Sequence, residues 1–255
     1  MSPADVVANP WFYMIAVPAL LMVGIFKAGF GTGAGVFAVA MTALVVPPFQ
    51  AAAILLPVLC MMDAIGVWAY RRSWDGANLA IMLPGAMVGV AVGTLTVDVL
   101  QSRHIALMIG VIAVAFSLRH LIGPAAPEAA PRRRWLGTFW AGVAGFTSFL
   151  AHAGGPPANI YLLPQRLDKS VFVGTTVVFF AVVNYVKLAP YAWLGQFSAE
   201  NLATALILAP IAPLAMWLGV GLHRRIDAAL FYKTCYRLLV VVGLKLIGDG
   251  LGLWG

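Results

Sequence analysis

The chain has 255 residues, of which 62% are hydrophobic and only 10% are Asp, Glu, Lys or Arg. Soluble domains carry about a quarter charged residues, so this composition excludes a soluble enzyme, a nucleic-acid-binding protein and a disordered segment. The net charge of +7 matches membrane proteins whose cytoplasmic loops collect Lys and Arg. The apolar runs do not alternate as a transmembrane β-barrel requires. The sequence therefore predicts an all-α polytopic membrane protein.

Apolar segments follow one another along the chain, separated by Pro, Gly and charged residues. In chain order they are Trp11–Phe30, Val36–Val46, Ala51–Tyr70, Leu79–Leu100, Ile105–Ile122, Trp135–Leu150, Ala158–Leu163, Val171–Leu194, Leu202–Leu222 and Ala228–Trp254. Six of the ten are long enough to cross a bilayer alone, which takes roughly 20 helical residues. Val36–Val46 and Ala158–Leu163 are too short. We expect about 8–10 membrane segments in all.

Each short segment follows a glycine-rich interruption, which we call the first glycine break (Gly29–Gly35, GFGTGAG) and the second glycine break (Ala151–Pro157, AHAGGPP). The two breaks begin an internal repeat with an offset of about 121 residues. The offset superposes Gly33 on Gly154, Asp63 on Asn184 and Tyr70 on Tyr191. Each half thus consists of a helix, a break, a short helix and three long helices.

The repeat divides the chain into an N-terminal transmembrane repeat, residues 1–122, and a C-terminal one, residues 135–255. Residues 123–134 (GPAAPEAAPRRR) form a linker that is rich in Pro and Ala and ends in three arginines.

The basic loop residues predict how the halves are oriented. If each broken pair of segments enters and returns on one side, the loop cations gather in the cytoplasm, and among loop charges only Arg103 lies opposite. The cations are Arg71, Arg72, Arg119, Arg132, Arg133, Arg134, Arg166, Lys169, Arg224 and Arg225. A single net crossing per pair would split them nearly evenly, so the positive-inside rule favours the first arrangement. The halves are then inverted repeats, with both termini outside and the linker in the cytoplasm, a recurring design of secondary transporters.

Charged side chains at membrane depth cost at least about 2.5–3.5 kcal/mol each and usually mark a function. The mid-segment candidates are Lys27, Asp63, Lys187 and Arg237. Three cations against one carboxylate predict an anionic ligand. Asn184 precedes Lys187 by one helical turn, so the amide and the ammonium can contact the same ligand. The alternative is that Lys187 snorkels to the membrane interface.

Asp63 is the only carboxylate well inside a long apolar segment. It is our candidate for proton coupling. Two alternatives remain open. One is a structural ion pair with Lys27, Lys187 or Arg237, and the other is a hydrogen bond between helices.

The glycine breaks are candidate substrate sites, because interrupted backbone is tolerated at membrane depth only where it is buried in protein or lines a cavity. The freed helix N-termini can attract an anion. The candidate residues here are Gly33, Gly154, Gly155, His152 and Ser148. The alternatives are that the glycines allow close helix packing and that the polar side chains bond neighbouring helices.

No nucleotide-binding P-loop, HExxH motif or cluster of His and Cys occurs, so we expect no ATP-driven pump, no metal, no cofactor and no enzyme. A small-anion channel remains an alternative to a carrier. A less favoured alternative is an intramembrane enzyme or accessory subunit for a lipid-linked substrate, which would need a nucleophile or metal cluster that this sequence lacks.

Two runs resemble a known family. GFTSFLAHAGGPPANIYLLP (Gly145–Pro164) and FVGTTVVFFAVVNYVKLAPYAWLGQFS (Phe172–Ser198) are similar to the TauE/SafE family of sulfite and organosulfonate exporters. The likeness extends from about Gly24 to Ile247. It implies a secondary transporter, in the inner (plasma) membrane, that exports a small sulfur-containing anion with proton coupling. Its partners would be that anion, protons and the lipid bilayer, with no nucleic acid, and a homo-oligomer is left open.

Overall fold

Helices make up the secondary structure throughout the part of the chain that the structure describes. This computed structural model describes residues 9–31, 35–97 and 129–253, together with scattered residues between 107 and 122. The helices are α2 (Pro10–Phe30), α3 (Gly35–Thr42), α4 (Pro48–Ala69), α5 (Gly76–Thr96), α7 (Arg134–Ala151), α8 (Gly155–Leu162), α9 (Lys169–Trp193), α10 (Ala199–Leu208), α11 (Ile211–Arg225) and α12 (Ala228–Leu251), with a 3-10 turn, η1, at Leu163–Gln165. The all-α prediction is confirmed.

Local sequence signals explain where most helices begin. At five helices, the side chain of the residue before the helix accepts a hydrogen bond from a backbone N–H of the first turn. These cap residues are Asn9 for α2, Asp75 for α5, Asp168 for α9, Ser198 for α10 and Asp227 for α12. Helix α2 also has a proline in its first turn, and α4 and α8 have a proline there in place of a side-chain cap. The N–H that proline lacks would have no helical partner at this position.

Four of the described helices, α2, α4, α5 and α9, are long and apolar enough to cross a membrane, or five if the bent pair of α10 and α11 is counted as one span. We predicted one continuous segment over Leu202–Leu222, and this is wrong. The chain bends by 43° between Leu208 and Ile211. The reason is Pro210, which offers no N–H and whose ring clashes with the preceding turn.

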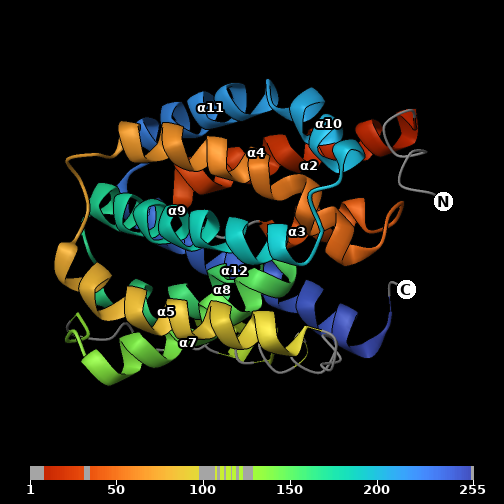
Figure 1. The fold of residues 1–255 in the computed structure, drawn as a ribbon. Coiled ribbons are helices and arrows are strands. Elements are labelled where there is room, and N and C mark those ends of the chain that lie inside the picture. The colour runs from red at the N-terminus through yellow and green to blue at the C-terminus, as the bar shows by residue number, and fades with distance from the viewer. Residues whose placement is uncertain are drawn as a thin grey trace.

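Helices α4 and α9 form the centre of the protein and run antiparallel. The backbone N–H of Asp75, just after α4, donates to Thr175 near the start of α9 over 2.9 Å. At the other end, the Gln50 amide of α4 donates to Asn201 of α10 over 3.0 Å. Figure 1 shows α9 running between the α2/α11 pair and the α5/α7 pair.

Those outer pairs join one half of the sequence to the other through glycines. A Cβ placed on Gly89 of α5 would lie 2.0 Å from the Gly142 carbonyl oxygen of α7. One on Gly24 of α2 would lie 2.3 Å from the Ala215 Cβ of α11. Such close backbone approach is the usual way in which membrane helices associate.

The basic loops meet at one end of the molecule, which we call the basic end. Arg132, before α7, forms a 2.5 Å ion pair with Asp75, before α5. The Lys169 ammonium, at the start of α9, donates to the His223 carbonyl near the end of α11 over 3.0 Å. The first turn of α2 and the last turn of α12 lie at the opposite end (Figure 1). Gathering at one end is what the same-side arrangement requires, while the side of the membrane stays a prediction.

Candidate functional site: a buried cavity between the two glycine breaks

The helices before the two breaks end in the same way. Gly31 after α2 and His152 after α7 both adopt the left-handed conformation, with φ of 61° and 51°. Each donates its backbone N–H to the carbonyl four residues earlier, Lys27 and Ser148 respectively, over 3.1 Å. Glycine tolerates this conformation without cost, whereas a histidine is strained there by about 1–2 kcal/mol. Side-chain contacts must hold His152 in place.

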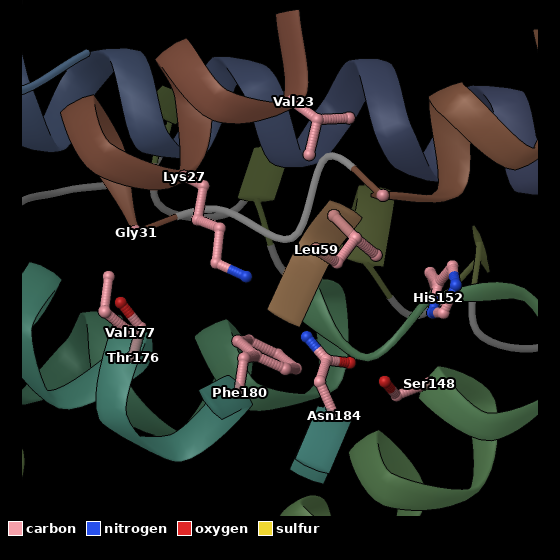
Figure 2. A pocket seen from close by; sticks show the side chains of 11 residues that line it. Val23, Lys27, Gly31, Leu59, Ser148, His152, Thr176, Val177, Phe180 and Asn184 are labelled. Carbon is pink, nitrogen blue, oxygen red and sulfur yellow. The ribbon is translucent and has the colours of Figure 1, made fainter. Parts of the chain in front are cut away.

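The two breaks meet in space. A Cβ placed on Gly35, the first residue of α3, would lie 2.8 Å from the Cβ of His152 in the second break. Between them is a cavity of about 30 Å³, which is room for about two water molecules. Its walls are Val23, Lys27, Gly31, Gly35, Leu59, Ser148, His152, Thr176, Val177, Phe180 and Asn184. Figure 2 shows the Lys27 ammonium and the Asn184 amide pointing into this space from α2 and α9.

A buried ion pair lies at the cavity. Lys27 Nζ is 2.5 Å from Asp63 Oδ1, and Asn184 Nδ2 donates to Asp63 Oδ2 over 2.7 Å. The Asp63 side chain is fully buried. Of the alternatives for Asp63, both the ion pair with Lys27 and the interhelical hydrogen bond are therefore present.

Asp63 and Asn184 are also the residues that the repeat superposes, and they lie 121 positions apart in the sequence. Two equivalent side chains can bond each other only near the axis that relates the repeats. The hydrogen bond between them is what the predicted repeat requires of two equivalent residues at its axis, and the cavity lies beside this bond.

Lys187 is enclosed by the second break. Its side chain is fully buried, so snorkelling to the interface is excluded. Its Nζ donates to the Ser148 carbonyl over 2.9 Å, to the Ser148 hydroxyl over 3.0 Å and to His152 Nδ1 over 2.9 Å. An ammonium has three N–H donors, and all three are used. Lys187 is not among the residues that line the cavity.

The same contacts determine the protonation of His152. Its Nδ1 accepts from Lys187, and its Nε2 lies 3.0 Å from the Ala52 carbonyl oxygen, to which it must donate. One accepting and one donating nitrogen make a neutral imidazole. These two bonds hold the strained residue and tie the second break to α4.

The remaining predicted site residues lie elsewhere. Gly154 and Gly155 are buried at the start of α8 but do not line the cavity. A Cβ on Gly154 would lie 2.6 Å from the Ala144 carbonyl oxygen, so this glycine allows close packing on α7. Arg237 is exposed on α12 and is not among the lining residues. Gly33 lies outside the described residues.

The apolar side chains of the cavity wall were not predicted from the sequence. Val23, Leu59, Val177 and Phe180 line it, and each stands in a long apolar segment where nothing distinguishes it from a lipid-facing neighbour. Helical periodicity could not have found Leu59, Val177 and Phe180, because 67% of the most apolar window of α4 and of α9 is buried.

Comparison with known proteins decides the family. A family model described as "Sulfite exporter TauE/SafE" matches residues 16–246 of the chain. The chain belongs to the TauE/SafE family. The TauE/SafE proteins are membrane transporters of sulfite and related anions, and the family and the apolar helices together make this chain a multi-pass membrane protein. No curated protein and no solved structure matches it.

The charges at the cavity suit a TauE/SafE transporter. Two buried lysines, Lys27 and Lys187, stand against one buried carboxylate, Asp63, and a neutral His152. This leaves one positive charge to be balanced by a ligand, and buried charges are stable only when paired. Among the described residues no group of His, Cys, Asp and Glu could hold a metal ion.

Proposed function

We propose that this protein is a secondary active transporter that exports a small sulfur-containing anion, such as sulfite or an organosulfonate, with proton coupling. The observation that carries the proposal is the buried Lys27 ammonium, which faces a cavity at the junction of both glycine breaks. Among the described residues it contacts one acceptor, Asp63, so it retains donors for the oxygens of an anion.

The other polar wall residues supply hydrogen bonds. In this proposal the Asn184 amide and the Ser148 hydroxyl orient the anion, and His152 closes the cavity toward α4. Lys187 contributes as a positioning residue, since its three donors hold Ser148 and His152. Its positive charge adds to the attraction, because electrostatic forces in a low-dielectric site act beyond hydrogen-bond distance.

The size of the cavity favours a carrier over a channel. The cavity has room for about two water molecules, which is less than an oxyanion with three oxygens needs. The surrounding helices must therefore separate to admit substrate, and a carrier that alternates between two closed states does this in every cycle.

Two measurements test the proposal. Purified protein is heated with sulfite, sulfate, sulfoacetate, taurine or acetate, and a sulfur anion at 100 times its dissociation constant should add about 2.7 kcal/mol of stability. Proteoliposomes loaded with unlabelled substrate should then accumulate labelled substrate against its gradient, as a carrier does and a channel cannot. Equal stabilisation by acetate and the sulfur anions, or absence of counterflow, would contradict the proposal.

A further inference from the structure

The ion pair at the cavity links anion binding to a proton. The groups that face Asp63 come from several helices: Lys27 from α2, Asn184 and Lys187 from α9, and Cys60 one turn away on α4 itself. His152 of the second glycine break lines the same cavity but is neutral, since one nitrogen accepts from Lys187 and the other donates to Ala52. Lys187 has its three donors occupied by Ser148 and His152. Lys27 and Asp63 are thus the two groups whose partners can change.

An entering anion competes with Asp63 for Lys27. The Lys27 ammonium is 2.5 Å from Asp63 Oδ1, and an anion that contacts the ammonium from the cavity lies within a few ångströms of that carboxylate. In a buried site like charges at that range repel strongly. A proton on Asp63 Oδ1 removes the repulsion and releases Lys27, while the Asn184 amide still satisfies Oδ2.

We infer that each monovalent anion held by Lys27 is accompanied by one proton on Asp63, so that anion and proton cross the membrane in the same direction. This inference rests on the proposed function and specifies the relative direction and the ratio in which anion and proton are transported. The proton enters from the aqueous side to which the cavity is open, binds Oδ1, and leaves from Oδ1 on the other side. No covalent bond to the substrate forms or breaks.

Direct pairing at Lys27 links the anion to the proton, while Lys187 keeps the same uncharged partners, Ser148 and His152, in every state. The empty cavity holds a Lys27–Asp63 pair, and the fully loaded cavity holds a Lys27–anion pair beside a neutral carboxylic acid. In both states Lys27 is compensated. An anion without a proton puts two negative groups side by side on Lys27, where they repel each other. A proton without an anion leaves Lys27 unpaired, and removing one member of a buried pair is strongly unfavourable. The two compensated states are therefore the ones that can close and reorient.

The coupling also determines what drives transport. Because one negative and one positive charge move together, transport is electroneutral and insensitive to membrane potential. Export is then driven by the outward gradient of the anion itself, and an inward proton gradient opposes it.

The binding test uses ethanesulfonate, which stays ionised across the whole pH range, so that only the protein titrates. For the wild-type protein the dissociation constant should rise with pH, by up to about tenfold per pH unit once Asp63 is ionised. Asp63→Asn imitates the protonated acid and should bind with an affinity that is independent of pH and close to the wild-type value at low pH. The matched control is Asp75→Asn, which removes a carboxylate at the basic end and should retain the wild-type pH dependence.

The transport test follows protons directly. Proteoliposomes filled with ethanesulfonate and a pH-sensitive dye are diluted into buffer without substrate. With wild-type protein the lumen should become alkaline as substrate leaves, at a rate unchanged by valinomycin and potassium; with Asp63→Asn no pH change should occur.

An acidified lumen, affinity that weakens as pH falls, or an Asp63→Asn variant with the wild-type pH dependence would each overturn the inference while leaving anion transport in place. If the wild-type protein binds neither ethanesulfonate nor sulfite at any pH, the proposed function fails and this inference fails with it.

Discussion

Tyr70 and Tyr191 make the same hydrogen bond in the two halves of the protein. Each donates its hydroxyl over 2.6 Å to a backbone carbonyl 42 residues earlier, at Ala28 and Phe149. Both carbonyls belong to the last turn of a helix that ends at a glycine break. Tyr70 is at the basic end, next to Arg71, and Tyr191 is near the opposite end of α9. The same contact at opposite ends is what an inverted repeat produces.

These two bonds should contribute alike. Replacing either tyrosine with phenylalanine keeps the ring and leaves a helix-end carbonyl without its donor, which costs about 1–3 kcal/mol when buried. We expect Tyr70→Phe and Tyr191→Phe to lower thermal stability by similar amounts. A large loss for one and none for the other would mean that the two contacts are not equivalent.

Lys27 should be the lysine that contacts substrate. Lys27→Met alone leaves Asp63 as an unpaired buried charge, at about 3–5 kcal/mol, so the informative variant is Lys27→Met combined with Asp63→Asn. Relative to Asp63→Asn alone, the double variant should bind substrate more weakly by about 1.5–3 kcal/mol, or roughly 10- to 150-fold. Titration of purified protein measures this, and a change below about threefold would remove Lys27 from the site.

Replacing Lys187 should chiefly lower the stability of the protein. Lys187→Met leaves the Ser148 hydroxyl and His152 Nδ1 without their donor, at about 1–3 kcal/mol for each unsatisfied group, and removes one of the two donors to the Ser148 carbonyl. We expect a markedly lower melting temperature without ligand and only partial rescue by Lys187→Arg, whose planar fork has a different shape. If Lys187→Met melts like the wild-type protein but loses affinity, Lys187 contacts the anion directly, as the spacing to Asn184 suggested.

Gly174 should tolerate no side chain. A Cβ there would lie 1.6 Å from the Ser73 carbonyl oxygen. At this point the start of α9 packs against the loop that follows α4. Gly174→Ala should cost about 1–3 kcal/mol or more, since backbone has to shift. Gly221 of α11 is the matched control because nothing lies within 4 Å of its Cβ position, and Gly221→Ala should be neutral or stabilising by up to about 1 kcal/mol. Equal melting temperatures for the two variants would contradict the packing at Gly174.

The orientation of the protein can be tested by labelling. Single cysteines at Arg133 and beside Arg224 should react with an impermeant maleimide only from the cytoplasm, and cysteines at the termini only from outside. The native thiols Cys60 and Cys235 are buried and give a low background. Labelling of Arg133 and Arg224 positions from opposite faces would exclude the inverted arrangement with both termini outside.

The sequence was sufficient for the features that depend on composition and local spacing. Unbroken apolar segments predicted an all-α membrane protein because a helix is the structure in which such a segment satisfies its own backbone in lipid. The motifs around the second break predicted the family. The offset between the halves also paired Asp63 with Asn184, and these side chains proved to bond each other.

Tertiary structure alone decided which buried charge faces the cavity. Asn184 and Lys187 share a helical face, as predicted, yet one bonds Asp63 and the other the second break. Helical spacing defines a face but not the neighbour that packs against it. The partner depends on how α2, α4, α7 and α9 cross, which is decided by close contacts between residues distant in sequence. For the same reason the sequence could not distinguish Arg237 from Lys27. In the structure Lys27 lines the cavity, whereas Arg237 is exposed on α12.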